Sequence, residues 1–430
     1  MATVFLPDSS RLTELGYGRV AHVPVLFDAE GRYCREINRY LRARATLDWH
    51  PMMDASEVGR DFPRQASLIS MAYELKNFND WCRDRKLDWR GLSYEDIRAY
   101  QADLLGGRWS ARPRHKLKAE TANARADQAT HFLRWAADQG LRSPFTIPMI
   151  EKVRAIRSRG SSIATRAIVR VRAGRAKRSN TTEIAKVVML PTVEEIREWL
   201  TSLQKARGYA KALACRMIIE VGLRRMEVCG LTVDMIPSGE ALEALHRKGI
   251  PSAPVSITLT KGGRPRTVQV PLPLAGELRT WIDTRRMTLA LRFRRRTGSM
   301  PSNALFLSDA SGFEGIPLAG HTIYKAFKAE PRPAAWHPHF GRHVFACFYV
   351  LHALNLDAAA AGGTIADQGA DWLQLRGRFW LDMLRRQLGH VSDETTDLYL
   401  RWLATATSVA SMANGWHDFL NLPHASEEIV

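Results

Sequence analysis

The spacing of apolar residues predicts a mainly helical first half of the chain. Between residues 64 and 145 apolar side chains recur every three or four positions, which places them on one face of an α-helix. Ser93 with Asp96 forms a helix-capping pattern, and a third helix is expected from Thr121 to a stop at Gly140. The first stripe consists of Leu68, Met71, Ala72, Leu75, Phe78, Trp81 and Cys82. These stripes predict a compact helical bundle.

The second half combines helices with a small β-sheet. It opens with another capping pattern, at Thr192 and Glu195. The elements expected after it are an apolar helix over 210–221 that ends at Gly222, an alternating hairpin over 255–270, a short strand at 304–307, and helices from 321 onward, the last with the apolar stripe Trp380, Leu381, Leu384 and Leu388. The predicted fold class is mainly α with a small β-sheet: a helical domain followed by a mixed α+β domain.

Residues 1–60 carry no recognisable chemistry. A strand is expected at 23–27, a turn at 28–31 and a short helix at 36–45. An accessory cap on the following helical domain is favoured over a second DNA-binding module.

The net charge of the chain indicates what kind of partner it binds. The 430 residues carry a formal net charge of +18, which calls for a polyanion, with nucleic acid favoured over an acidic membrane surface. No apolar run is expected to span a bilayer, and the N-terminus lacks the pattern of a signal peptide. The five cysteines are far apart and odd in number, so neither a disulfide framework nor a zinc site is predicted. A cytoplasmic, nucleoid-associated protein is expected.

Two basic segments are candidate DNA contacts. The loop at 108–118 leads into a helix N-terminus, where side-chain charge and the helix dipole both favour phosphate; the alternative is a solvated surface. Residues 152–178 contain no Asp or Glu, which predicts a self-repelling linker that becomes ordered along DNA rather than a floppy spacer. The candidate contacts are Arg108, Arg112, Arg114, Lys116 and Lys118 in the loop, and Arg166, Arg170, Arg172 and Arg175 in the linker.

Five short motifs occur in an order that identifies a family. They are Gly222-Leu223-Arg224-x-x-Glu227, Thr260-Lys261-Gly262, His339-x-x-Arg342-His343, Leu388-Gly389-His390, and Tyr399. Over about residues 190–403 the chain resembles the catalytic domain of the tyrosine recombinase (phage integrase-like) family, and 64–145 is similar in pattern to its core-binding domain. The implied organisation is an accessory region (1–60), a helical core DNA-binding domain (61–150), a basic linker (151–190), and a catalytic domain with a C-terminal tail (191–430).

Phosphoryl transfer explains two of the motif residues. Displacement at a phosphodiester concentrates negative charge on the non-bridging oxygens, and two guanidinium groups hold both oxygens without a metal. Arg224 and Arg342 are the candidates, against the alternative that an Arg at a helix start forms a surface ion pair. Glu227 is expected to orient these groups, or else to pair with Arg224 on a solvated face.

The remaining roles follow from the resemblance. Lys261 is expected to protonate the departing 5′ oxygen, with Arg264 and Arg266 as competitors. His339 exchanges a proton with the phenol or donates to the phosphate, and His390 donates a further hydrogen bond. The rivals of His339 are His337 and His343.

Tyr399 is the predicted nucleophile, and attack by its phenol gives a 3′-phosphotyrosyl bond and a free 5′ hydroxyl. The alternative for any Tyr on an apolar helix is core packing. Because the covalent bond conserves the phosphodiester energy, neither a cofactor nor a metal is expected.

The chain departs from the family pattern at two places. Gly341 stands where the family usually has a bulky apolar residue, which predicts looser packing before Arg342. The stretch between Arg342 and His390 is longer than usual and is expected to form a surface elaboration, with protomer contacts as one role. The apolar tail after Tyr399 packs on its own domain or on a neighbouring protomer.

The implied function is site-specific recombination, integrating or excising a mobile element, as in transposition. The expected partners are double-stranded DNA, further copies of the chain in a tetrameric synapse, and accessory DNA-bending proteins. Two alternatives stay open: a type IB topoisomerase-like nicking and closing enzyme, and a catalytically inactive DNA-binding architectural or regulatory protein.

Overall fold

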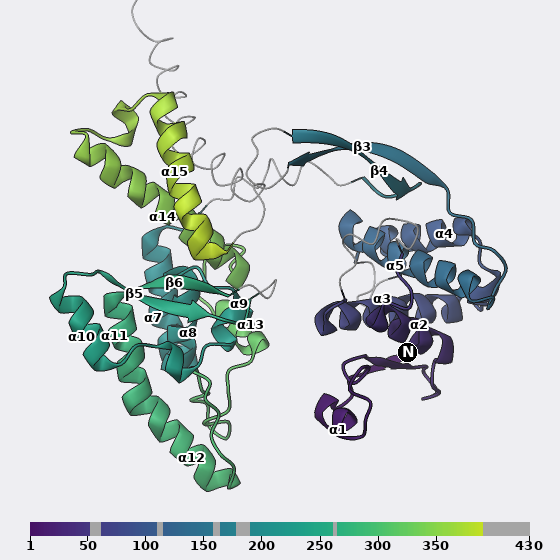
Figure 1. The fold of residues 1–430 in the computed structure, drawn as a ribbon, viewed down its shortest axis with the longest axis horizontal. Coiled ribbons are helices and arrows are strands. Elements are labelled where there is room, and N and C mark those ends of the chain that lie inside the picture. Colours follow the sequence, from purple (N-terminus) through teal and green to yellow (C-terminus); the bar gives the residue numbers. More distant parts are fainter. Residues whose placement is uncertain (52–61, 110–114, 158–163, 178–189, 261–264, 390–430) are drawn as a thin grey trace, which may run out of the picture. The chain divides into compact units, whose positions relative to one another are not determined.

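The protein consists of two compact units, residues 1–183 (the N-terminal unit) and 184–430 (the C-terminal unit). The computed structural model describes residues 1–51, 62–109, 115–157, 164–177, 190–260 and 265–389. Most described elements are helices, and the strands form antiparallel pairs (Figure 1). The predicted fold class, mainly α with a small amount of β-structure, is confirmed.

Four helices form the centre of the N-terminal unit. Apolar stripes from all of them meet in one core that contains Trp81, Tyr100 and Phe132. The predicted cap at Ser93 is present, with the Asp96 carboxylate accepting from the Ser93 backbone N–H in return. The helices are α2 (Arg35–Thr46), α3 (Gln65–Asp84), α4 (Tyr94–Gly106) and α5 (Ala119–Asp138), with a short 3-10 turn, η1 (Trp89–Gly91), before α4.

The first fifty residues are built into this same core. They form β1 (Thr3–Phe5), α1 (Ser9–Glu14), β2 (Val25–Phe27) and then α2. The side chain of Asn38 accepts from Leu26 N and donates to Leu26 O, at 2.7 and 2.9 Å, which fastens β2 to α2. The Tyr40 hydroxyl accepts from Gln128 on α5 at 2.8 Å. The segment therefore shares buried side chains with the helical bundle and does not form a core of its own.

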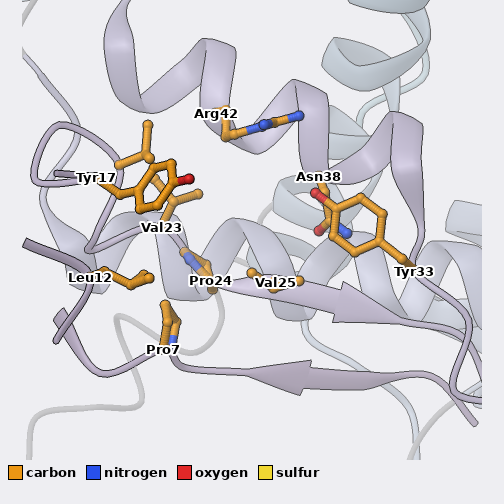
Figure 2. Close-up of a pocket in the computed structure, with 10 residues that line it drawn as sticks. Pro7, Leu12, Tyr17, Val23, Pro24, Val25, Tyr33, Asn38 and Arg42 are labelled. Atoms are coloured by element: carbon orange, nitrogen blue, oxygen red, sulfur yellow. The ribbon is translucent and has the colours of Figure 1, made fainter. Parts of the chain in front are cut away.

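A pocket lies between α1, β2 and α2 (Figure 2). Leu12, Tyr17, Val23 and Pro24 supply most of its lining, and Asn38 and Arg42 lie at its polar side. Because Asn38 already bonds to Leu26, the pocket holds no set of groups suited to acid–base or nucleophilic chemistry among its described lining residues.

Part of the predicted linker is a β-ribbon. β3 (Met149–Arg157) and β4 (Ala164–Arg172) pair antiparallel from Met149 opposite Arg172 to Arg157 opposite Ala164. A self-repelling linker was expected over this stretch, and the structure shows a paired ribbon there. Val153 and Ile168 pair directly, and both strands are rich in β-branched residues, whose strand propensity outweighs the repulsion between basic neighbours.

The C-terminal unit opens on the predicted cap of Thr192 and Glu195. Its helices are α7 (Val193–Arg207), α8 (Tyr209–Ile219), α9 (Arg225–Cys229), α10 (Gly239–Arg247), α11 (Leu272–Trp281), α12 (Met287–Thr297), α13 (Gly320–Phe327), α14 (Pro338–Ala360) and α15 (Ala370–Leu388). Short helical turns are η2 (Val233–Met235), η3 (Ile282–Arg286) and η4 (Ile365–Asp367).

The predicted hairpin is present and the predicted strand after it is not. β5 (Ser252–Ile257) pairs with β6 (Arg266–Pro271), whose Val268 and Val270 are buried. Residues 304–307 make only isolated bridges, at Ala304 and Leu307. The Trp281 indole N–H donates a hydrogen bond to Leu305 O at 3.0 Å. A side chain therefore satisfies a backbone acceptor to which a neighbouring strand would otherwise donate.

Most residues between Arg342 and His390 belong to two helices, α14 and α15. α14 and α15 pack along each other through a small core that includes Val350, Leu354 and Leu384. The expected surface elaboration is thus, over its described residues, a helical hairpin. α14 is also a described helix long and apolar enough to cross a membrane by length and composition, which corrects the expectation that no such run exists. Its buried residues pack in the cores of this unit.

Candidate active site

The candidate site forms where α8 ends. Gly222, directly after α8, has a φ of +76°, and a Cβ there would lie 2.5 Å from a Phe345 ring carbon and 2.7 Å from a Leu388 methyl. Glycine therefore allows the chain to turn beneath α14 and α15. The next two residues bring Arg224 to the N-cap of α9.

Glu227 is the centre of the site. Its side chain is 1% exposed and accepts from the backbone N–H of Arg224 at 2.7 Å and from Arg224 Nη1 at 2.9 Å. Arg266 donates to both of its oxygens at 2.8 Å, and Arg342 Nη1 lies 3.8 Å away. Burial raises the pKa of Glu227, but hydrogen bonds from Arg266 and Arg224 outweigh it and lower the pKa to about 2. The Glu227 carboxylate is therefore ionised and accepts hydrogen bonds from both Arg224 and Arg266.

Arg224 and Arg342 converge on the end of α15. Arg342 is 2% exposed and donates to the carbonyls of Gly222 and Leu388. Arg224 donates to Leu388 O at 3.4 Å and to Gly389 O at 3.3 Å, and 27% of its side chain remains exposed. The structure thus brings together the three predicted residues Arg224, Glu227 and Arg342, directly before residue 390.

Arg266 belongs to this cluster, and the sequence analysis named it only as a rival of Lys261. Besides the two hydrogen bonds to the Glu227 carboxylate, the Arg266 side chain donates from Nε to Gln387 O at 3.0 Å. The sequence contains a pattern that predicts this burial. Arg266 lies two and four residues before Val268 and Val270, so it shares their buried face of β6. An arginine on a buried strand face requires an acidic partner, and Glu227 is that partner.

Gln387 docks α15 on the hairpin. Its amide donates to Gln269 O at 3.0 Å and to Val221 O at 3.1 Å, and accepts from Gln269 N at 2.8 Å. α15 ends at Gly389, whose φ is +61° and where a Cβ would lie 2.8 Å from Arg266 Cδ. These contacts fix the point at which the chain continues toward His390.

Three histidines at the start of α14, its N-cap His337 and the helical His339 and His343, have different surroundings. His337 Nδ1 accepts from Phe340 N at 3.1 Å and so caps the helix. His339 is exposed, and its Nε2 lies 3.1 Å from Nε2 of His343. Burial, followed by the charges of His339 and Arg342, lowers the pKa of His343 to about 4. At neutral pH His343 is therefore an uncharged hydrogen-bond partner for His339.

Gly341 is closely packed, which corrects the expectation of looseness. A Cβ there would lie 2.8 Å from Phe327 Cε1 and 3.1 Å from Ile219 Cγ2. The Phe327 ring occupies the space that a bulky side chain at residue 341 would fill.

Three predicted catalytic residues, Lys261, His390 and Tyr399, lie outside the described residues. So do Arg112 and Arg114.

The described basic residues differ in their availability to DNA. Lys116 and Lys118 are exposed, and Arg108, also exposed, donates to Asp103 at 2.8 Å. Arg170 is largely exposed beside Glu151, and Arg166 lies within β4. Arg175 is partly buried against Asp127.

Arg172 does not fit its prediction as a DNA contact. Its side chain is 4% exposed and bonds to Asp127, Gln101 and Tyr94. The alternation along β4 turns this residue toward α4 and α5, where a buried guanidinium needs these acceptors. Arg172 is a structural anchor.

Comparison with known proteins gives matches to solved structures. No protein-family model and no curated protein sequence matches the chain. XerA recombinase is 15% identical, with 86% of this chain and 98% of that chain covered and a TM-score of 0.32. The catalytic domain of bacteriophage HP1 integrase is 18% identical, with coverages of 52% and 96% and a TM-score of 0.28. A lambda integrase tetramer bound to a Holliday junction is 13% identical, with coverages of 91% and 96% and a TM-score of 0.41.

Proposed function

We propose that this chain is a site-specific DNA recombinase that cleaves and rejoins strands through a 3′-phosphotyrosyl intermediate on Tyr399. One observation carries the proposal: Arg224 and Arg342, from separate helices, both donate to Leu388 O beside the buried carboxylate of Glu227. Two guanidinium groups are thereby held at the point where the chain continues toward His390 and Tyr399.

The arginine cluster supplies electrostatic stabilisation. Displacement at phosphorus places negative charge on the non-bridging oxygens, and a pre-organised cation stabilises this charge without reorganising during the reaction. Arg224 keeps part of its side chain exposed, which we propose leaves it accessible to a phosphate oxygen, while Glu227 fixes its orientation. Arg342 adds positive charge from a buried position.

The remaining steps are proton transfers and one exchange of bonds. The Tyr399 oxygen bonds to phosphorus as the bond to the 5′ oxygen breaks, and His339 takes the phenolic proton. Lys261 gives a proton to the 5′ oxygen, and His390 donates a hydrogen bond to the phosphate. Attack by a 5′ hydroxyl of a second strand reverses these steps and releases Tyr399.

Recombination defines the partners that we propose. Exchange between two duplexes requires four strand cleavages, so four copies acting on double-stranded DNA complete one reaction. We propose integration or excision of a mobile element as the setting, with DNA-bending proteins as accessory factors and the nucleoid as the location.

Trapping on nicked DNA tests the function. The full chain is incubated with a pool of nicked duplexes of varied sequence, in which loss of a short 3′ fragment after cleavage prevents religation. We expect a covalent adduct with the wild type and with Tyr324→Phe, an exposed tyrosine of α13, and none with Tyr399→Phe. DNA binding without any adduct would favour an inactive DNA-binding protein. Relaxation of supercoils without joining of two DNAs would favour the topoisomerase-like alternative.

A further inference from the structure

The β3–β4 ribbon is a strongly basic element with an apolar surface. Residues 149–172 contain seven Lys and Arg residues and one acidic residue, Glu151. Val153 and Ile168, a directly opposed pair, are 66% and 68% exposed. Two apolar side chains exposed side by side on a cationic ribbon indicate a surface that another molecule covers.

The base of the ribbon is fixed to the N-terminal unit. The buried Arg172 bonds to Asp127 and Gln101, and the Tyr94 hydroxyl, which it also contacts, donates to Ala173 O at 2.6 Å. Just beyond β4 two further side chains hold the backbone: Gln101 donates to Gly174 O at 2.8 Å, and Asn123 bonds to Ala176 N and O at 2.9 Å each. A two-stranded ribbon is marginally stable alone, so this anchoring sets its direction relative to the helices.

The outer residues remain available to a partner. Lys152 and Arg170 are exposed, and Glu151, which pairs with Arg170 at 3.1 Å, is itself exposed. In Figure 1 the ribbon is seen apart from the helices α2–α5 of its own unit. Because side chains alternate between the two faces of the ribbon, Arg170 lies on the face of Val153 and Ile168, and Lys152 lies on the opposite face.

Charge and shape together identify the partner as duplex DNA. A second copy of the ribbon would bring together two elements that each carry six net positive charges, from seven basic residues and one acidic residue. The major groove of B-DNA accepts a two-stranded ribbon; its phosphates attract the basic residues, and thymine methyl groups offer an apolar contact.

We infer that the β3–β4 ribbon is a DNA-binding arm of the N-terminal unit that enters the major groove, with Arg172 as its positioning residue. This inference rests on the proposed function, because DNA is the substrate there. It adds a contact outside the arginine cluster around Glu227.

Salt-dependent binding of the full chain to a mixed-sequence duplex tests the arm. Lys152→Gln/Arg170→Gln removes two phosphate contacts, and we expect the slope of log affinity against log salt to become shallower by about 2. The matched control, Arg11→Gln/Lys86→Gln, removes two exposed charges from the same unit and should leave the slope unchanged. An unchanged slope for the ribbon variant would overturn the inference.

Groove occupancy provides a second readout. Val153→Ser/Ile168→Ser should weaken binding severalfold on thymine-containing duplex and less on duplex with uracil in place of thymine, because the methyl contact is already lost there. Methyl green, a major-groove ligand, should compete with the wild type more strongly than with this variant. A changed oligomeric state with unchanged DNA binding would instead make the ribbon an interface between copies. If arm-dependent binding is seen but no Tyr399 adduct forms, the arm stands and the proposed activity fails.

Discussion

Arg266 donates to both carboxylate oxygens of Glu227, each at 2.8 Å, while its Nε donates to the carbonyl of Gln387 at 3.0 Å. One side chain therefore joins the loop that carries Arg224 to the helix that precedes His390. Arg266 is a positioning residue: it bonds to groups of the protein, and its effect on DNA is exerted through them.

Arg266→Ala should destabilise the C-terminal unit by about 3–5 kcal/mol, because it leaves a buried carboxylate without its bidentate partner. Arg266→Lys restores the charge without the fork and should recover part of this loss. Thermal unfolding of the full chain measures both variants. Arg279→Ala, which breaks a partly exposed i,i+4 pair with Asp283, is the control and should change stability by less than about 1 kcal/mol.

The rate of Tyr399 adduct formation distinguishes a purely structural role of Arg266 from a positioning role. At a temperature where Arg266→Lys is fully folded, we expect the rate of Tyr399 adduct formation to fall at least tenfold while duplex affinity stays within a factor of about 3. Equal rates in the two proteins would reduce Arg266 to a stabilising residue.

Acid should weaken the C-terminal unit through His343. Burial lowers the pKa of its imidazole from 6.5 to about 4, with His339, Arg342 and His337 as the neighbouring charges. The unfolded chain binds a proton near pH 6.5 and the folded chain does not, so this stability is complete above pH 6.5 and is lost as the pH falls toward 4. Urea unfolding at intervals between these values should show a slope that His343→Gln reduces by up to about 1.4 kcal/mol per pH unit.

His321→Gln is the matched control for this titration. His321 is exposed on α13, and the slope of that variant should equal that of the wild type. If His343→Gln and the wild type also share one slope, burial of His343 does not govern the acid response of this unit.

The sequence predicted elements and motif geometry better than it predicted the roles of basic residues. Capping patterns at Ser93 and Thr192 located helix starts, since they depend on neighbouring residues alone. Arg172 and Arg266 look like solvated charges in a basic sequence, yet each is buried beside an acidic residue far away in the chain. The pairing partners, Asp127 and Glu227, become evident only once the tertiary fold is known.

β-Structure was the other source of error. Residues 149–172 contain β-branched side chains in both strands, but their charge obscured this strand propensity and a linker was expected. Residues 304–307 have strand composition, yet side chains such as that of Trp281 satisfy their backbone acceptors. Composition describes a preference for extended backbone, whereas a strand also requires a neighbouring strand.

Releasing the anchor of the ribbon should affect DNA binding without touching DNA. Arg172→Ala removes one of the two arginine partners of Asp127 and the bonds to Gln101 and Tyr94, so hydrogen exchange over residues 164–172 should accelerate by at least tenfold in the full chain. Duplex affinity should fall as in the Lys152→Gln/Arg170→Gln protein. Arg170→Ala, next to the anchor but exposed, should leave exchange in β4 unchanged. Unchanged exchange in Arg172→Ala would show that the other contacts suffice to hold the ribbon.

Arg44 offers a route to a more stable protein. It is 8% exposed on α2, and its Nε and Nη1 are buried without a hydrogen-bond partner in the structure. Burial lowers its pKa, and its charge also contributes, after burial, to lowering the pKa of His131 on α5 to about 4. Arg44→Met keeps an unbranched side chain and removes the unsatisfied donors, so the N-terminal unit should gain about 1–3 kcal/mol.

The gain should appear as a higher unfolding temperature for the transition that contains α2, and it should increase as the pH falls toward 4, where folded His131 takes up a proton and no longer meets the charge of Arg44. Arg42→Met, at an exposed position on the same helix, should shift stability by less than about 0.5 kcal/mol. A loss of stability in Arg44→Met comparable to that of a core truncation would mean that the guanidinium makes a favourable contact, such as the approach of its Cζ to the Trp49 ring at 6.0 Å, that outweighs its missing hydrogen bonds.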